Sequence, residues 1–507
     1  MEPADRTTDL SLADFRAATA AQWRRAVLAR DVSCVELTTT ALTAAATMSG
    51  LGAFLHLDPE FALARAAQTD ATLDLLGRSE DRGLTELSAT HPLLGLPTAF
   101  KDLVPVAGLP LTMGTAALPP QVPARDHPLA RRVHRAGAIS VGKTQVPEFG
   151  LPCYSENRIG APARNPLSLT RTAGGSTGGG AAAVAAGILP FAPGSDGGGS
   201  IRIPAAACGL VGLKPGRGRM SDDDAGTGVR SLMTSGPLAT TAEDAALLFD
   251  VMAGHRFTVS SDAVAGSRSR GSRRKEFPLA EGPAMRTVRR ALSEGLPPLR
   301  VGVTTESPFS PDVEITLEEP ALAALEAGIA AVSESGHVVQ GTDHCTGADR
   351  FWPEGYHRRF QTLWTSRLAE SEFTEEQVTQ LEPLTRYFLD LAGSRPQEKT
   401  QEAITSLQEF SDNVEEIFGP WDVIMTPMLA FRPPEIGWFA ALPPEENYVQ
   451  QCRFTPYSSV VNVLGLPAIN VPVHTDAESM SWSVQLIGKH GSEEQLLALA
   501  ATMMSAQ

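Results

Sequence analysis

Apolar residues recur along this chain at two different spacings, and each spacing predicts a different kind of element. Over residues 10–75 they stand at helical spacing, so this stretch is predicted to be helical, with Ser11 and Ser33 as N-caps. Short apolar runs bounded by Gly or Pro predict buried strands. These runs fall at 138–144, 299–303, 338–339 and 421–427. Further helices are predicted over 127–136, 242–252, 320–334 and 493–503.

Two glycine clusters between Arg171 and Arg219 interrupt this pattern, and each carries one serine. Ser176 lies in GGSTGG and Ser200 lies in DGGGSIR. Glycine lets the backbone reach φ > 0, so several N–H groups can point at one spot, as an oxyanion site requires. A flexible linker would be polar and solvated, whereas these glycines flank a small apolar helix over 181–188 and an apolar segment over 208–213. The clusters are therefore predicted to be buried.

Lys101 stands in an almost wholly apolar segment, PLLGLPTAFKDLVPVAG. The residues alone favour a lysine on an exposed strand edge, because lysine is seldom buried without a partner. A buried amine is the alternative, and burial would lower its pKa so that it could act as a base near neutrality. Lys143 follows the buried strand at 138–144 and is a second candidate.

The order of these motifs resembles the amidase signature family. The chain reads GGSTGG, then AAAVAAG, GSDGGGSIRIPA and GLVGLKP, without gaps against the family pattern. The resemblance covers nearly the whole chain, is strongest over 94–255 and 421–503, and includes GxPxxxKD around Lys101. It implies an α/β fold, the amidase signature fold, in which α-helices cover both sides of a large mixed twisted β-sheet.

The resemblance also assigns roles to individual residues. It implies a catalytic group of Lys101, Ser176 and Ser200 with a cis peptide bond between Gly175 and Ser176, and it makes Lys143 structural. Ser200 would attack the carbonyl, Ser176 would relay its proton and neutral Lys101 would accept it. The expected oxyanion donors are the backbone N–H groups of Gly197, Gly198, Gly199 and Ser200. Supporting roles are expected for Thr177, Asp196 and Arg202, and substrate contacts for Phe149, Cys153, Tyr154, Gly174 and Gly175.

Composition shifts divide the chain into four predicted parts. Residues 1–80 form a helical region packed on the core, and 81–255 form the signature core. Residues 256–298 contain the basic, Ser/Gly-rich run SRSRGSRRKEF and are predicted to be a surface insertion. Residues 299–507 complete the same fold, with a variable helical pocket region at 350–420 whose aromatic residues serve either the core or the pocket.

Charge and cysteine content exclude several other classes of protein. The net charge of −16 disfavours nucleic acid as a partner, because phosphate binding needs clustered Lys and Arg. The five scattered cysteines favour a reducing cytoplasm over a disulfide framework or a zinc site. We find no signal peptide and no membrane-spanning apolar run. The expected partner is a small-molecule amide, without metal or organic cofactor; the sequence leaves a homodimer open.

Three rival functions remain to be tested. Gly174-x-Ser176-x-Gly178 fits the nucleophile elbow of α/β-hydrolases, although 165–172 is a poor buried strand. The tRNA-dependent glutamine amidotransferase subunit shares the family core, but it usually has glutamine where Ile203 stands, and its SRYG segment is missing. The third rival is a binding scaffold that has lost catalysis.

The chain departs from the usual family pattern at three positions. Gly197 and Gly216 stand where the family more often has threonine, and Thr177 stands where it more often has serine. Amides, esters, carbamates and 6-aminohexanoate oligomers all fit as substrates.

Overall fold

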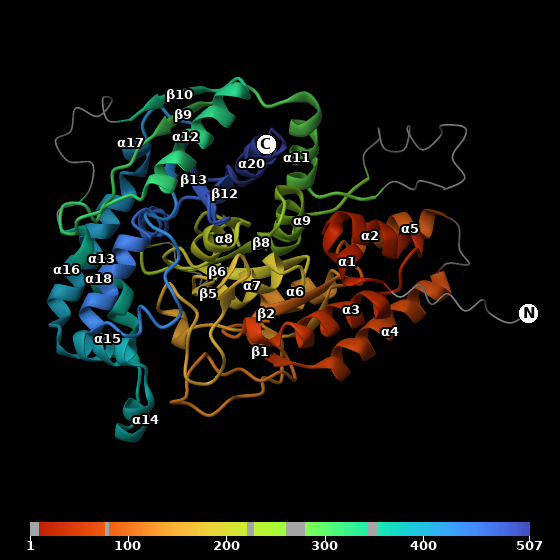
Figure 1. Ribbon diagram of the computed structural model, residues 1–507, viewed down its shortest axis with the longest axis horizontal. Helices are drawn as coiled ribbons and strands as arrows, with labels where there is room; N and C mark the ends of the chain where they lie inside the picture. Colours follow the sequence, from red (N-terminus) through yellow and green to blue (C-terminus); the bar gives the residue numbers. More distant parts are fainter. Residues whose placement is uncertain are drawn as a thin grey trace, which may run out of the picture.

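The computed structural model describes residues 10–76, 81–220, 228–259, 279–342, 353 and 355–506. Its centre is an eight-stranded mixed sheet with helices on both sides (Figure 1). Only β10, β9 and β11 run parallel; every other pair in the sheet is antiparallel. In spatial order the strands are β10 (Val338–Gly341), β9 (Arg300–Val303), β11 (Val423–Pro427), β13 (Ser481–Gly488), β12 (Ala468–Thr475), β7 (Val211–Lys214), β8 (Thr234–Ala239) and β6 (Phe191–Asp196).

A second sheet of three strands lies beside β6, and it carries the lysine that the sequence singles out. Its order is β1-β3-β2, with β2 parallel to β3 and β1 antiparallel. All five residues of β2 are buried, which explains its apolar composition. The strands are β1 (Phe54–Leu57), β2 (Pro97–Lys101) and β3 (Ile139–Thr144). A separate two-stranded ribbon, β4 (Arg164–Asn165) and β5 (Ser168–Thr172), is exposed only in part.

Two groups of helices cover the large sheet. On one side, α9, α11, α12 and α20 contact one another and the strands; on the other, α7 and α8 pack together against β6, β7 and β8. The first group is α9 (Ala242–Met252), α11 (Pro283–Glu294), α12 (Glu319–Glu334) and α20 (Glu493–Ser505); the second is α7 (Gly178–Ala185) and α8 (Arg202–Cys208). This layered arrangement is the predicted fold class.

The N-terminal helices pack against the smaller sheet (Figure 1). Ser11 and Ser33 accept hydrogen bonds from the backbone at the starts of their helices, so both predicted N-caps are confirmed. The predicted all-helical stretch is wrong at β1, which pairs with β3 as an edge strand. These elements are α1 (Leu12–Ala17), α2 (Ala20–Ala29), α3 (Cys34–Thr47), η1 (Ser49–Leu51), α4 (Pro59–Leu76), α5 (Asp81–Thr90), α6 (Pro128–Arg135) and η2 (Glu148–Gly150).

A wing of helices at one end of the large sheet has its own apolar cluster of aromatic and aliphatic side chains. Figure 1 shows α13, α15, α16 and α18 gathered there, with α14 projecting from the edge. This wing forms the outer wall of the candidate site. Its members are α13 (Tyr356–Thr365), η3 (Ser366–Glu370), α14 (Glu375–Gln380), α15 (Pro383–Ser394), α16 (Gln397–Asp412), α17 (Val414–Phe418), α18 (Pro444–Phe454) and α19 (Ser459–Leu464).

The predicted insertion at 256–298 needs correction where the structure describes it. Residues 260–278, with the basic run, lie outside the described residues. From Pro283 the chain forms α11, which buries Met285 and Val288 and packs against α9 and α20. The N–H groups of Ala284 and Met285 donate to buried Asp250. Pro283 at the start of this helix and the apolar residues at helical spacing after it would have predicted α11. The sequence prediction extended the basic, Ser/Gly-rich character of 256–278 over these residues and so missed the helix.

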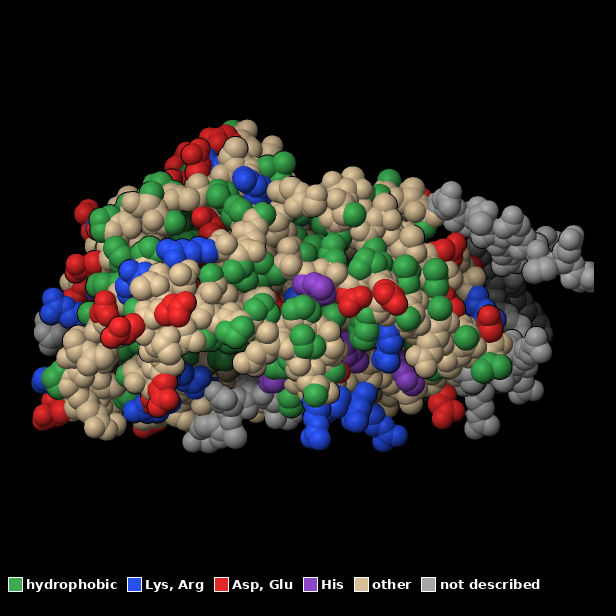
Figure 2. Space-filling view, turned by 90° about the horizontal axis from the view of Figure 1, so that it is seen from below, with side chains coloured by type: hydrophobic (Ala, Val, Ile, Leu, Met, Phe, Trp, Pro, Cys, Tyr) green, Lys and Arg blue, Asp and Glu red, His purple; other side chains and the backbone are tan. Residues whose placement is uncertain are grey.

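Charged side chains of both signs are interspersed on the face shown in Figure 2, without one continuous basic surface. None of the described helices combines the length and the apolar composition that a membrane span needs. Among the described residues, no cluster of His, Cys, Asp and Glu side chains is placed to hold a metal ion.

Candidate active site

Lys101 ends strand β2 with its side chain 1 % exposed. Its Nζ lies 2.7 Å from the Oγ of Ser176, 3.0 Å from the Oγ of Ser195 and 3.3 Å from the Ser195 carbonyl oxygen. Ser195, at the end of β6, is a partner that the sequence reasoning missed. The contact between β2 and β6 brings it there, and the sequence alone does not reveal such a pairing.

Burial controls the protonation of this amine. Loss of hydration lowers the pKa of Lys101 to about 7, although the negative charge of Asp196 acts in the opposite direction. The hydroxyl and carbonyl oxygens around Nζ carry no charge that could restore a normal value. A substantial fraction of Lys101 is therefore a neutral amine near pH 7, and a neutral amine can accept a proton.

Ser176 lies in the turn between β5 and α7, and the peptide bond between Gly175 and Ser176 is cis. Glycine is required at position 175 because a Cβ there would stand 2.6 Å from the backbone nitrogen of Tyr154. Gly174 has φ of +76°, which L side chains rarely adopt. Both predicted substrate-contact glycines thus shape the turn that presents Ser176.

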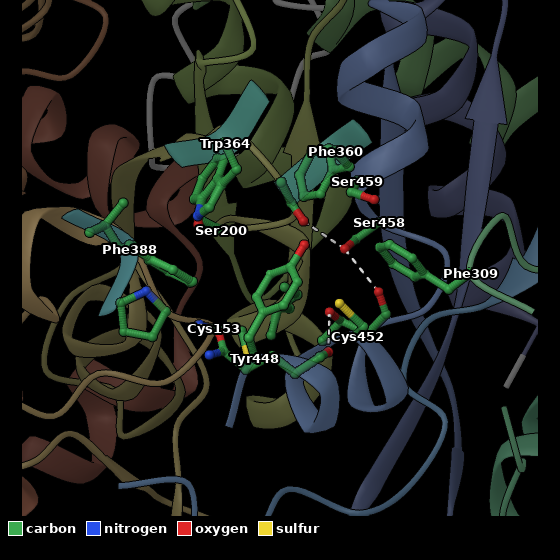
Figure 3. A pocket seen from close by; sticks show the side chains of 16 residues that line it. Cys153, Ser200, Phe309, Phe360, Trp364, Phe388, Tyr448, Cys452, Ser458 and Ser459 are labelled. Carbon is green, nitrogen blue, oxygen red and sulfur yellow. Dashed lines mark hydrogen bonds between the residues drawn. The ribbon is translucent and has the colours of Figure 1, made fainter. Parts of the chain in front are cut away.

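Ser200 follows the second glycine cluster and adjoins the first serine loop. The Thr177 N–H donates to the Ser200 carbonyl oxygen at 3.2 Å, which ties the two loops together. The Ser200 side chain is on the wall of a pocket, where Figure 3 labels it. Within the described part of the chain, its hydroxyl has no hydrogen-bond partner, so it is available to a molecule in the pocket.

A buried ion pair holds the second glycine loop in place. Arg202 donates to both carboxylate oxygens of Asp196, at 2.9 and 3.0 Å, and both side chains are fully buried. Asn462 donates to the carbonyl and carboxylate oxygens of Asp196, while its own amide oxygen accepts from Arg202. Gln485 accepts from the other guanidinium nitrogen. Burial alone would raise the pKa of Asp196, but Arg202 holds it well below its usual range.

The same carboxylate corrects the predicted set of oxyanion donors. The Gly199 N–H donates to Asp196 Oδ1 at 2.7 Å, so it is not available to a substrate. Gly197, Gly198 and Ser200 keep N–H groups that have no acceptor among the described residues. Gly199 has φ of +125°, which explains why its N–H turns toward Asp196. The oxyanion site can therefore use three of the four predicted donors.

Lys143 serves the structure rather than the pocket. Its Nζ lies 2.9 Å from the carboxylate of Asp102, and both side chains are almost fully buried. The other carboxylate oxygen of Asp102 accepts from the Thr112 N–H at 2.9 Å and from the Thr112 hydroxyl. Lys143 is thus bound to a charged partner behind β2, whereas Lys101 faces uncharged serine oxygens.

Sixteen residues line the pocket next to Ser200, and Cys153 is the one predicted substrate-contact residue among them. Phe149 instead packs against Phe373, with ring centroids 5.9 Å apart. Tyr154 stacks on Phe439 at 4.8 Å and its hydroxyl accepts from Asn447, away from the pocket. Of the aromatic residues in 350–420 for which the sequence left core or pocket open, Phe360, Trp364 and Phe388 line the pocket. Phe309 and Tyr448 line it too, and sequence reasoning missed both.

The departure at Gly197 has a counterpart in this wall. A Cβ at Gly197 would lie 3.2 Å from Trp364 Cζ3, and a Cβ at Gly198 would lie 3.5 Å from Phe360 Cζ. The Phe360 and Trp364 rings stack at 5.8 Å over the glycine loop. Because Gly197 has no side chain, the Trp364 indole can pack directly against the glycine loop.

The fold and this arrangement define an α/β protein of the hydrolase class with two glycine-rich serine loops, and comparisons with known proteins agree. The Amidase family matches residues 36–497, so the chain belongs to the amidase family. A putative amidase of Synechocystis sp. is 32 % identical over 98 % of this chain and 90 % of its own length. The putative amidase AmiB2 of Mycobacterium tuberculosis is 34 % identical over 82 % of each chain.

Other relatives show how widely the fold is used. A glutamyl-tRNA(Gln) amidotransferase subunit from Ralstonia nicotianae is 30 % identical over 94 % of this chain and 95 % of its own. The solved structure of 6-aminohexanoate cyclic dimer hydrolase has a TM-score of 0.79 and 25 % identity, covering 98 % of this chain and 97 % of its own. The family and the fold are thus established, while the substrate differs among relatives.

The buried ion pair predicts a large loss of stability when one partner is removed. Arg202→Met leaves Asp196 charged and unpaired, and we expect it to lower the free energy of unfolding by about 3–5 kcal/mol. Arg289→Met, which breaks the half-exposed pair with Glu281, is the control and is expected to cost about 0–1 kcal/mol. Urea unfolding of both variants measures this. Equal effects of the two substitutions would contradict the role given to Arg202.

The contact between Gly197 and Trp364 predicts coupled effects on activity. Gly197→Thr forces the loop or the indole to move, and we expect kcat/KM to fall by about 10–100-fold. Combining it with Trp364→Leu provides room, so the double variant loses less than the product of the two single losses. A double-mutant cycle on kcat/KM measures the coupling. Gly341→Thr, at a position with no atom within 4 Å of the added Cβ, is the control; additive single effects would refute the contact.

Proposed function

We propose that this protein is an amidase that hydrolyses a carboxylic amide through an acyl-enzyme on Ser200, with Ser176 and Lys101 as the proton relay. One observation carries the proposal. The Lys101 amine lies 2.7 Å from the Ser176 hydroxyl and has a pKa of about 7, so a group that can accept a proton lies next to the serine that would relay it. The Thr177 N–H donates to the Ser200 carbonyl oxygen, so the loops that carry Ser176 and Ser200 are adjacent, as the proposed relay requires.

The steps follow from these positions. Ser200 Oγ attacks the amide carbon while its proton passes to Ser176 Oγ, and the Ser176 proton passes to the neutral Lys101 amine. The two serine hydroxyls close to bonding distance when substrate is bound, as catalytic hydrogen bonds often do. The N–H groups of Gly197, Gly198 and Ser200 bind the oxyanion. The relay then returns the proton to the departing nitrogen, and water hydrolyses the ester by the reverse path.

The same machinery would also cleave esters, carbamates or amide oligomers, linear or cyclic, and these are the alternatives within this class. Two of the relatives are called putative amidases. One structural neighbour is called a hydrolase of a cyclic 6-aminohexanoate dimer, a molecule without a free carboxylate or amine. These names have an amide as the substrate in common, and the uncharged lining of the present pocket favours a neutral one.

A glutamine amidotransferase role is supported by the relative that carries that name, but the pocket disfavours it. Free glutamine carries an ammonium and a carboxylate group. None of the sixteen residues that line the pocket is charged, so neither group would find a counter-ion there. Ile203 also stands on this wall, at the position where that subunit usually has glutamine. We therefore favour the amidase.

A nucleophile elbow at Ser176 is also disfavoured. That chemistry needs a histidine beside the serine, whereas among the described residues the Ser176 hydroxyl has Lys101 as its hydrogen-bond partner. The partner that our proposal requires is a small-molecule amide, with no nucleic acid, membrane or cofactor. A cytoplasmic location is part of the proposal, supported by the scattered cysteines.

The lowered pKa of Lys101 predicts a pH dependence of activity. Below pH 7 the amine gains a proton and loses its function as a base, so kcat/KM is expected to fall about tenfold per pH unit and to level off above a pKa of about 7. Lys101→Met is expected to lower kcat by about 10²–10⁴-fold. Lys399→Met, on the surface, serves as the control. A pH-independent rate, or an active Lys101→Met variant, would exclude Lys101 as the base.

Covalent labelling distinguishes the two serines. A fluorophosphonate probe is expected to react with Ser200, because its hydroxyl faces the pocket, and peptide mass spectrometry locates the adduct. Ser200→Ala is expected to abolish labelling and turnover, while Ser195→Ala, which removes only a Lys101 contact, retains labelling. An adduct on Ser176 would instead support the nucleophile elbow and would refute the proposed relay.

A further inference from the structure

The residues that line the pocket beside Ser200 are all uncharged. Its sixteen lining residues come from the loops around Cys153 and Ser200, the segment at Phe309 and the helices of the wing, and none of them is Asp, Glu, Lys, Arg or His. An unpaired charge transferred into such surroundings would lose its hydration without compensation. The lining therefore favours an uncharged group in this pocket.

Aromatic rings set the shape of the same space. Phe388 meets Tyr448 edge to face at 5.6 Å, Phe309 meets Phe360 at 6.4 Å, and Phe360 stacks on Trp364. Figure 3 shows these rings arranged around the cavity. Flat and edge-on ring surfaces pack best against another ring. The cavity volume is about 50 Å³, so the space between these rings is narrow.

The polar groups on the wall are nearly all engaged with the protein itself. Ser458 donates to the Gly198 carbonyl at 2.6 Å, and Ser459 is 3.0 Å from the Tyr356 hydroxyl. Thr455 donates to the Gln451 carbonyl oxygen, and the Gln451 amide bonds to Asn447 and to the Cys153 N–H. Apart from the Ser200 nucleophile, these groups hold the wall together and have little capacity left for a ligand.

Tyr448 is the exception. Its side chain lines the pocket at 5 % exposure, and among the described residues its hydroxyl has no nitrogen or oxygen partner, only the Cys452 sulfur. Cys452, one helical turn further along α18, offers only a weakly accepting sulfur. Burial raises the pKa of Tyr448 well above its usual range, so the hydroxyl keeps its proton and can donate. A thiol sulfur satisfies a buried donor only weakly, so a nitrogen or oxygen acceptor on a ligand would bind this hydroxyl better.

We propose that the acyl group of the substrate is an uncharged aromatic ring that bears a hydrogen-bond acceptor, and that the Tyr448 hydroxyl donates to this acceptor. The inference rests on the proposed amidase function. The pocket is assigned to the acyl side because Ser200 is on its wall, and the acyl group stays attached to Ser200 after the amine has left. Tyr448 is thus a specificity-determining residue.

The test compares benzamide with the three pyridinecarboxamides, in which one ring C–H becomes an acceptor nitrogen at nearly constant shape. The ratio of kcat/KM between each pyridine amide and benzamide is measured in the wild type and in Tyr448→Phe. Because ring nitrogen also changes intrinsic reactivity, the change in ratio is the readout. For at least one isomer we expect the ratio to fall about tenfold in the variant. We also expect 4-carbamoylbenzoate, which carries a charge on the ring, to react about 100-fold more slowly than benzamide.

Tyr387→Phe is the matched control, since Tyr387 lies on α15 outside the pocket lining, and its ratios should equal those of the wild type. Unchanged ratios in Tyr448→Phe, or equal losses for all four amides, would overturn the role of Tyr448. Turnover of acetanilides without benzamides would overturn the acyl assignment. Labelling of Ser200 without turnover of any aromatic amide would overturn the substrate class alone, whereas a failure of Ser200 to react at all would overturn the proposed function.

Discussion

The burial of one lysine amine is the constraint on which this active site depends. Lys101 has a lowered pKa because β2 carries it out of water, yet the carboxylate of Asp196 nearby acts to raise that pKa again. The two effects coexist because Arg202, Asn462 and backbone N–H groups engage the negative charge of Asp196 on its other side. We infer that the network around Asp196 does two things: it fixes the glycine loop that carries Ser200, and it limits the influence of this carboxylate on the pKa of Lys101.

Much of this arrangement follows from local sequence. Helical spacing predicts α9, α12 and α20, and short apolar runs predict β3, β9 and β11, because these patterns reflect which face of an element is buried. Glycine positions around Ser176 and Ser200 predict tight loops for a local steric reason. At Gly175, for instance, any side chain would strike the Tyr154 backbone.

The features that the sequence left hidden depend on pairing between distant segments. β1 has only four residues, all half-buried, and it is a strand because β3 offers an edge. Ser195 meets Lys101 only because β6 lies beside β2. The direction of the Gly199 N–H is set by an aspartate whose partner, Asn462, is 266 residues away along the chain. No local pattern encodes these contacts.

The Lys101, Ser176 and Ser200 side chains and most of the pocket wall come from different parts of the chain. Relatives that differ in name can therefore share this fold and differ in the pocket. The proposed base, relay serine and nucleophile come from β2 and the two glycine loops, whose conformation is fixed by backbone packing and buried ions. The walls that face the substrate come from α13, α15 and α18 in the helical wing, which has a separate apolar cluster. Side chains of α13, α15 and α18 that do not touch the glycine loops can change without disturbing the proposed proton path, whereas Asn462 of α19 supports it through Asp196. Where a wing side chain does touch the catalytic loop, as Trp364 does at Gly197, the two positions must change together.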